Sequence, residues 1–247
     1  MRIAFRTHSG MVTNHNEDFF SVLVDPHLSL VIVADGVGGH HAGEVASRLG
    51  VKVVQDFLAN RLTRLEEEEI TELLRQAFHE AHQEITRQAD SDDKFAGMGT
   101  TMVLGLFQSG KLHLAHVGDS RAYLIESRGI TSLTQDHSLV ASMVQSGMIT
   151  SEEAKTHHLR NIITQCLGCS EYTGPEIRTI DLTNGDIFLF CSDGLTDMLD
   201  DKKIYKIVRR NSRKLPNCAD KLVAMANKNG GCDNITVVVV NYNGDKS

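Results

Sequence analysis

The sequence lacks features that several classes of protein require. Its 247 residues contain no tryptophan and only three prolines, and no proline- or serine-rich stretch or internal repeat divides the chain. No run approaches the roughly 18 consecutive apolar residues of a membrane-spanning helix, and the N-terminus has no signal-peptide pattern. We therefore predict a single domain over residues 1–247, located in the cytoplasm and without a membrane partner.

Basic charge and cysteine are also scarce. The formal net charge is -7, whereas a nucleic-acid binder normally presents a basic face, so we expect no nucleic-acid partner. The five cysteines are an odd number, and Cys191 lies in an apolar run, which favours reduced thiols over a disulfide framework. A single CxxC pair, Cys166 and Cys169, has no second pair beside it, so neither structural zinc nor a redox function is favoured.

One stretch organises the rest of the chain. The apolar run Leu30–Ala34 is typical of a buried strand, and it ends at Asp35, which is followed by Gly36 and three more glycines. A carboxylate at the end of a rigid strand, beside glycines that let backbone approach closely, suits a hard cation or a phosphate. The alternative is an ordinary strand-to-helix turn with Asp35 as a helix cap.

Hydrophobic periodicity predicts an α+β fold. Apolar residues recur at helical spacing within 45–57 and 70–85, and two further helices are expected at about 201–210 and 217–228. The strands between them are short and are joined by predicted hairpin turns at 109–110, 128–129 and 184–185. We expect a four-layer αββα sandwich, with two mainly antiparallel sheets flanked by helix pairs.

Four carboxylates share the same context. Asp35, Asp119 and Asp193 each follow an apolar strand, and Asp233 directly precedes one. If these strand ends converge, the carboxylates repel one another unless cations lie between them, and oxygen ligands favour Mg²⁺ or Mn²⁺. The alternative is that all four merely form turns.

A two-metal site would support phosphoryl transfer to water. Two divalent ions about 3.5–4 Å apart share and activate a hydroxide and clamp a phosphoryl oxygen for in-line attack. The leaving alkoxide then needs a proton, for which His40 and His41, just beyond Asp35, are the best candidates.

Several motifs together resemble one family. They are Asn16-Glu17-Asp18, Ala34–Ser47, Gly97-Met-Gly-Thr-Thr101, His116-Val-Gly-Asp119-Ser-Arg121, Cys191-Ser-Asp193-Gly194 and Asp233-Asn234-Ile-Thr-Val237. In this order they look like the bacterial branch of the metal-dependent Ser/Thr protein phosphatases, the PPM or type 2C family. The motifs span nearly the whole chain, which makes the resemblance specific.

The resemblance implies a ligand set for two metal ions and a possible third. Asp35 would bridge two Mn²⁺ or Mg²⁺ ions, the Gly36 carbonyl would bind one of them, and Asp193 and Asp233 would complete the other. Glu17 would act through water with Asp18 in support, and Asp119 together with Asp193 would hold the third ion of bacterial members.

The same resemblance implies the remaining parts of the site. His40 would be the catalytic histidine, with His41 as the alternate, acting beside Asp35. The insertion at about 136–165 would be the flap that borders the substrate cleft.

Two positions depart from the family pattern. Thr13 stands where members commonly carry a phosphate-binding arginine, and His8 stands where an aspartate is common. Loss of the arginine removes a bidentate, charge-assisted clamp. Thr13 and His15 are therefore our candidate substrate-binding residues, with Arg6 or Arg160 as further substitutes for the arginine.

The leading hypothesis is an enzyme. It would hydrolyse phosphoserine and phosphothreonine in proteins by a metal-activated water, reversing a cognate Ser/Thr kinase, and we expect a monomer. One alternative is a weak or inactive relative that acts as a phosphoprotein-binding regulator. Another is hydrolysis of small phosphate esters at the same site.

Overall fold

The computed structural model describes residues 1–25, 28–38, 42–59, 61 and 67–243. Two five-stranded sheets form its centre, and every strand pairing in them is antiparallel. The first sheet has the order β1 (Arg2–His8), β12 (Ile235–Asn241), β11 (Ile187–Cys191), β8 (Arg121–Ile125), β9 (Ile130–Ser132). The second has the order β10 (Glu176–Asp181), β7 (Lys111–Val117), β6 (Met102–Gln108), β3 (Leu28–Ala34), β2 (Phe19–Val24). A short ribbon pairs β4 (Gly36–Val37) with β5 (Gly99–Thr100).

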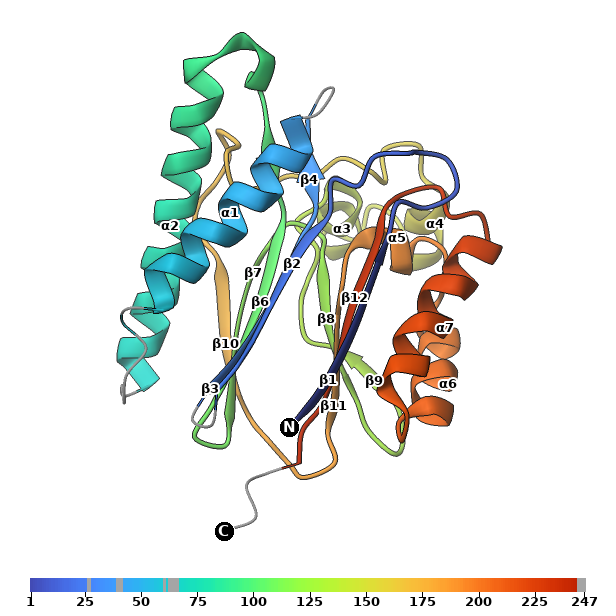
Figure 1. Ribbon diagram of the computed structural model, residues 1–247. Helices are drawn as coiled ribbons and strands as arrows, with labels where there is room; N and C mark the ends of the chain where they lie inside the picture. The colour runs from blue at the N-terminus through green and yellow to red at the C-terminus, as the bar shows by residue number, and fades with distance from the viewer. Residues whose placement is uncertain (26–27, 39–41, 60, 62–66, 244–247) are drawn as a thin grey trace.

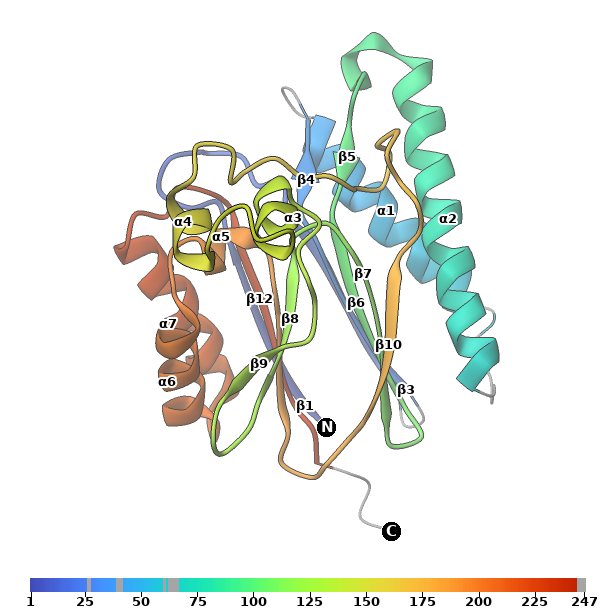
Figure 2. The same cartoon turned by 180° about the vertical axis from the view of Figure 1, so that it is seen from behind.

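Helix pairs cover the outer face of each sheet, as Figures 1 and 2 show. On the second sheet lie α1 (Ala42–Ala59) and α2 (Glu67–Ser91), and a 3-10 turn, η1 (Asp93–Phe95), follows α2. On the first sheet lie α6 (Asp201–Asn211) and α7 (Leu215–Lys228). The predicted αββα sandwich is confirmed.

The central strands of both sheets are buried on both faces. In β3, Leu30 and Ile32 pack toward α1 and α2, whereas Val31 and Val33 pack between the sheets. Strands that are covered on both sides read as continuous apolar runs, which is why this run is so marked in the sequence. Gly105 on β6 lets the sheets approach, because a Cβ there would overlap the Phe190 ring.

Smaller helices lie near one end of the sandwich. They are α3 (Leu139–Gln145), α4 (Ser151–Thr156) and α5 (Asp193–Thr196). The Thr-x-x-Glu pattern of Thr150 and Glu153 predicts a capping box, and one is present at the start of α4. The same pattern at Thr63 and Glu66 lies outside the described residues. None of the helices described is long and apolar enough to cross a membrane.

Two expectations about local structure were wrong. The turn at 184–185 is no hairpin, because β10 pairs with β7 while β11 pairs with β12 and β8, so the turn passes from one sheet to the other. Turn-forming residues specify a reversal but not which strands then pair. The cysteines are also not all reduced thiols, since Cys166 and Cys169 form a disulfide. The tight turn that brings them together is marked by the Cys169 N–H, which donates to the Cys166 carbonyl over 3.3 Å.

Candidate functional site

Asp35 is held at the point where β3 leaves its sheet. Its carbonyl accepts hydrogen bonds from the Thr101 N–H (2.9 Å) and the Thr100 hydroxyl (2.8 Å). Its own N–H donates to the Thr101 Oγ1 over 3.2 Å. Three hydrogen bonds on one residue's backbone fix the direction in which the carboxylate leaves the strand.

Gly36 is required by the closeness of two neighbouring backbone segments. Its N–H donates to the Glu17 carbonyl over 3.2 Å, and a Cβ on Gly36 would overlap the Gly43 carbonyl. The Glu17 carboxylate packs so closely on Gly43 that a Cβ there would overlap Oε2. The Ser47 hydroxyl, from α1, donates to the Glu17 carbonyl over 2.6 Å. Gly36 and Gly43 therefore let Glu17 lie beside Asp35 and Gly36.

Asn234 joins the N-terminal loop to the second half of the site. Its Oδ1 accepts the Glu17 N–H over 2.6 Å, and its Nδ2 donates to the His15 carbonyl over 2.9 Å. Its own N–H donates to Oδ1 of Asp233 over 2.7 Å. One side chain thus fixes Glu17 next to Asp233, which is 216 positions away. The sequence motif contained Asn234, but nothing in the pattern assigned it this role.

Two carboxylates are buried with an oxygen left unsatisfied. Oδ2 of Asp18 accepts the Ser192 hydroxyl over 2.7 Å, but its Oδ1 has no hydrogen-bond partner. Oδ1 of Asp193, the first residue of α5, is likewise buried without a partner. Buried carboxylate oxygens are normally hydrogen-bonded or bound to a metal, so these two atoms fit the role of cation ligands.

The carboxylates act on one another electrostatically. Burial first, and then the charges of neighbouring aspartates, hold the pKa of Asp35 and of Asp193 well above the usual range. Burial raises the pKa of Asp18 and of Asp119 to about 7. The charges that raise the pKa of Asp35 come from every other predicted aspartate ligand: Asp18, Asp193, Asp119 and Asp233. The strand ends therefore converge as the sequence indicated.

Divalent cations fit this donor set. The oxygens are hard ligands, they repel one another, and two of them lack any other partner. Without positive charge, several of these carboxylates would be protonated near neutral pH. The arrangement is therefore complete only with cations bound.

The other predicted residues lie in the N-terminal loop, on β1, in the segment 136–165 and outside the described residues. Thr13 and His15 lie in the loop that leads to Glu17, where the Thr13 Oγ1 accepts the His15 N–H over 3.1 Å. Arg6 is turned away, since its Nε pairs with Asp220 on α7 at 3.0 Å. Arg160 approaches the site instead, with its Nε 4.0 Å from a carboxylate oxygen of Asp197. The candidate proton donors His40 and His41 lie outside the described residues.

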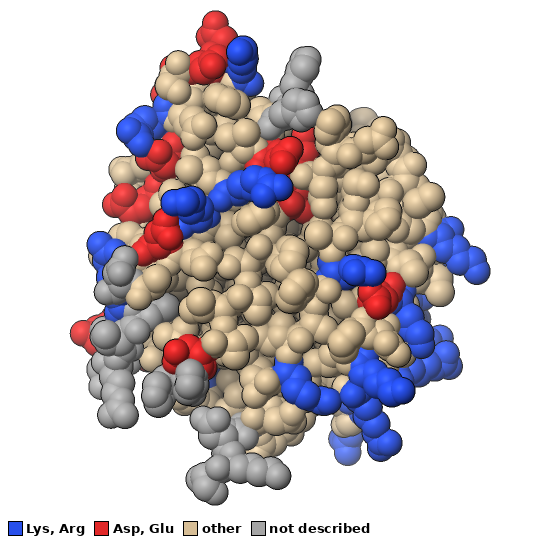
Figure 3. Space-filling model, in the orientation of Figure 1, with Lys and Arg blue, Asp and Glu red and all other residues tan. Residues whose placement is uncertain are grey.

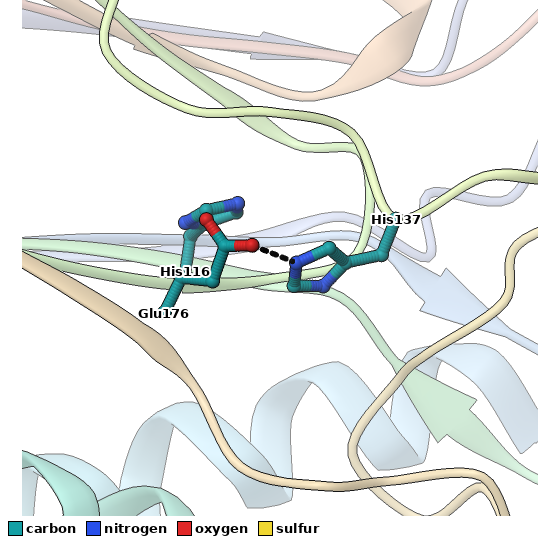
Figure 4. A group of neighbouring side chains, drawn as sticks. All are labelled: His116, His137 and Glu176. Carbon is teal, nitrogen blue, oxygen red and sulfur yellow. Dashed lines mark hydrogen bonds and ion pairs between the residues drawn. The ribbon is translucent and has the colours of Figure 1, made fainter. Parts of the chain in front are cut away.

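Sequence reasoning missed a second group of side chains near the site. His116 on β7, Glu176 on β10 and His137 place ligand-type atoms within 4.8 Å of one another (Figure 4). The Gln135 carbonyl accepts a hydrogen bond from Nε2 of His116 over 2.9 Å. Nδ1 of His137 accepts the Gly118 N–H over 3.2 Å, while its Nε2 lies 3.3 Å from Glu176. We call these three residues the histidine cluster.

The hydrogen bonds of His137 fix its tautomer. Because Nδ1 accepts from Gly118, the proton of the neutral ring lies on Nε2, where it donates to Glu176. A metal bound through Nε2 would need that lone pair, and metal-bound histidines use their other nitrogen as a donor. The cluster is therefore satisfied by hydrogen bonds. It also joins two segments, since the His137 N–H donates to Gly118, next to Asp119, and its carbonyl accepts from Thr164.

Comparison with known proteins agrees with this geometry. Residues 8–229 match the family described as Protein phosphatase 2C. The chain is 38% identical over 241 residues to "Serine/threonine phosphatase stp" of Listeria monocytogenes, covering 97% of this chain and 95% of that protein.

Solved structures are similar over the same length. The structure of serine/threonine phosphatase Stp1 from Staphylococcus aureus has a TM-score of 0.91 at 33% identity, covering 98% of this chain and 95% of that one. A PstP catalytic domain in complex with two manganese ions has a TM-score of 0.82 at 33% identity, covering 96% of each chain.

Proposed function

Because this chain belongs to the protein phosphatase 2C family, we propose that Asp35 and the carboxylates around it hold the divalent cations of a phosphoprotein phosphatase. The chain is a serine/threonine phosphatase and therefore a hydrolase. Its relatives carry that name, and none of these findings favours the inactive regulator. The observation that carries the proposal is the group of buried, mutually repelling aspartates with two unsatisfied oxygens.

We assign the metal ligands as the family resemblance implied. Asp35 would contact two ions, the Gly36 carbonyl one of them, and Asp193 with Asp233 the other. Glu17 and Asp18 would support these two ions, and Asp119 would join Asp193 at a third. The two manganese ions of the PstP domain support the count of two, and oxygen ligands suit Mn²⁺ and Mg²⁺ alike.

Bound cations and the residues of the protein would supply different parts of the chemistry. When bound, divalent cations supply the positive charge that lowers the pKa of water and stabilises charge on phosphoryl oxygens. The protein keeps the backbones of Asp35 and Glu17 in place through hydrogen bonds to the Thr101 N–H, the Ser47 hydroxyl and the Asn234 side chain. We assign proton donation to the leaving serine or threonine oxygen to His40, with His41 as the alternate.

We assign phosphate capture to Arg160 in place of the arginine absent at position 13. Its guanidinium lies beside Asp197, whose charge contributes to the raised pKa of both Asp193 and Asp119. With nearly half of its side chain exposed, Arg160 can reach a substrate phosphate at the rim of the carboxylate group. Thr13 and His15 would contact the same phosphate from the opposite loop.

The biological setting follows from the reaction. We propose that the substrates are phosphorylated proteins, that a Ser/Thr kinase produces them, and that the chain acts as a cytoplasmic monomer without a nucleic-acid partner. The segment 136–165, which contains α3, α4 and Arg160, would be the flap of a single domain over residues 1–247.

Turnover of a phosphothreonine peptide and of p-nitrophenyl phosphate tests the function. We expect activity with Mn²⁺ and none after chelation, and absence of turnover in excess Mn²⁺ would refute the proposal. Equal specificity constants for the two substrates would favour small phosphate esters instead.

Three variants test the assignment of phosphate capture. Arg160→Ala should raise KM for the peptide roughly tenfold, because a charge-assisted contact is lost. Arg6→Ala is the matched control, since Arg6 pairs with Asp220 away from the site. If Thr13→Arg leaves KM unchanged or higher, phosphate binding is not limited at position 13.

A further inference from the structure

Basic residues are concentrated in one helix pair of an otherwise acidic protein. The chain has a net charge of -7, yet residues 201–228, which form α6 and α7, carry only two acidic residues, Asp201 and Asp220. The nine basic residues of this segment are Lys202, Lys203, Lys206, Arg209, Arg210, Arg213, Lys214, Lys221 and Lys228. Figure 3 shows lysine and arginine gathered on the α6–α7 side of the molecule.

The seam between α6 and α7 is hollowed into a groove. It has a volume of about 460 Å³, and its polar walls come from Lys206 and Arg210 on α6 and from Lys221 and Lys228 on α7. Its apolar lining comes from Ile207, Ala224 and Met225. Met225 is one of the large apolar side chains that the described residues leave exposed, with 38% of its surface accessible. We call this feature the α6–α7 groove.

The charges around the groove are not neutralised within the protein. None of the ion pairs among the described residues involves the four basic side chains that line it. Lys221 donates a hydrogen bond to the neutral Asn211 side chain instead. Four neighbouring cations repel one another, so an anionic ligand would lower their energy.

We propose that the α6–α7 groove docks an acidic segment of a phosphoprotein substrate, with an aliphatic residue of that segment seated on Met225 and Ile207. The acidic side chains would meet Lys206, Arg210, Lys221 and Lys228. The positive charge of the groove would favour acidic residues in the segment, and the apolar lining would favour the aliphatic residue, which we call the anchor.

The shape and charge of the groove favour a peptide over other polyanions. α6 has 11 residues and is therefore about 16 Å long, a distance that about five residues of extended chain would span. The lining contains no aromatic side chain on which bases could stack. The net charge of -7 repels a polyanion that extends beyond the groove, such as nucleic acid or an anionic membrane, whereas a short acidic segment would contact the groove alone.

Docking at this groove would affect catalysis without touching the site. The groove lies on the outer face of the first sheet, whereas the carboxylates lie at the end of the sandwich. A substrate held at both places would present its phosphorylated residue at a raised effective concentration. This consequence rests on the proposed phosphatase function, whereas binding to the groove does not.

Direct binding is the first test. The probe is a fluorescein-labelled, unphosphorylated peptide of about ten residues, rich in glutamate with one central leucine, measured by fluorescence anisotropy on the Mn²⁺-loaded protein. The double variant Lys206→Glu/Arg210→Glu should bind it at least roughly tenfold more weakly. The control Arg75→Glu/Lys94→Glu changes the net charge equally but on the α2 side, and it should bind like wild type. Equal loss in both double variants would overturn the proposal.

The apolar anchor and the class of ligand are tested separately. Replacing the central leucine of the probe by serine should weaken binding several-fold, and unchanged binding would overturn the assigned role of Met225 and Ile207. Tighter binding of a single-stranded RNA or of phosphatidylserine vesicles than of the peptide, lost in Lys206→Glu/Arg210→Glu, would likewise overturn a peptide ligand.

Catalysis supplies the last test. A phosphothreonine peptide that carries the acidic segment should have a several-fold lower KM than one without it, and Lys206→Glu/Arg210→Glu should abolish that difference. Turnover of p-nitrophenyl phosphate should be the same in wild type and in this variant. If KM is insensitive to the segment while p-nitrophenyl phosphate is still hydrolysed, the docking proposal fails and the phosphatase function stands.

Discussion

Two clusters of metal-binding residue types lie close together in this protein, and they are built on opposite electrostatic principles. The aspartates around Asp35 repel one another, and oxygens of Asp18 and Asp193 have no partner. In the histidine cluster, His116 and His137 are neutral donors, each with a hydrogen-bond acceptor. The first cluster is incomplete without cations, whereas the second is complete without them. Ligand identity and proximity alone would not have separated the two.

The two clusters should differ most in how strongly activity depends on a single carboxylate. Asp35→Asn keeps the size of the side chain but removes the carboxylate on which all the other predicted aspartate ligands act electrostatically. We expect activity to fall by more than the roughly 10–100-fold that loss of an outer-shell partner typically costs. The chelated variant should unfold at a higher temperature than chelated wild type, because an amide avoids the cost of either protonating or charging this buried carboxyl on folding. Turnover and thermal unfolding, with the exposed Asp90→Asn as control, measure both effects.

Retention of activity by Asp35→Asn would contradict its role as a metal ligand. A lower unfolding temperature of the chelated variant would show that the aspartates are not in net repulsion.

The pH dependence of stability should differ between metal-free and metal-bound protein. Burial raises the pKa of Asp18 and Asp119 to about 7, so the folded state binds more protons than the unfolded state between about pH 4 and 7. The stability from these groups is therefore fully present at low pH and is lost as pH rises toward 7. Each contributes a slope of at most about 1.4 kcal/mol per pH unit. Chemical denaturation of chelated protein between about pH 5 and about pH 7.5 measures this slope.

Saturating Mn²⁺ should reverse that slope, because the cations bind the deprotonated carboxylates. Asp18→Asn should flatten it in the chelated protein, since one of the shifted groups is removed. A chelated protein whose stability rises over this pH range would be inconsistent with the raised pKa values.

The sequence predicted the layers of the fold more completely than the arrangement of the site. Apolar runs such as Leu30–Ala34 indicated strands buried on both faces, and strand ends indicated where Asp35 and Asp193 would meet. These signals are local and periodic. The turn at 184–185 was misassigned because strand pairing is a non-local choice. The hydrogen bonds of Asn234 and the meeting of His116 with Glu176 depend on register between distant strands, which no single-sequence pattern encodes.

His137 should matter for stability and for the Asp119 loop, but not as a metal ligand. His137→Ala removes the acceptor for the buried Gly118 N–H, at an expected cost of about 1–3 kcal/mol of unfolding free energy. Because Gly118 precedes Asp119, more Mn²⁺ should be needed for half-maximal activity. Denaturation and Mn²⁺ titration measure the two effects. Stoichiometric zinc binding by wild type that is lost in this variant would instead identify the histidine cluster as a metal site.

The smallest expected effect separates a hydrogen bond from a charge. Glu176→Gln keeps an oxygen that can accept the Nε2–H of His137 but removes the negative charge. If the cluster is a neutral hydrogen-bonded group, the variant should lose less than about 1 kcal/mol of stability and keep activity within about twofold of wild type. Glu176→Ala, which removes the acceptor as well, is the comparison variant. A loss in Glu176→Gln as large as in Glu176→Ala would mean that His137 is charged, and the contrast between the two clusters would no longer hold.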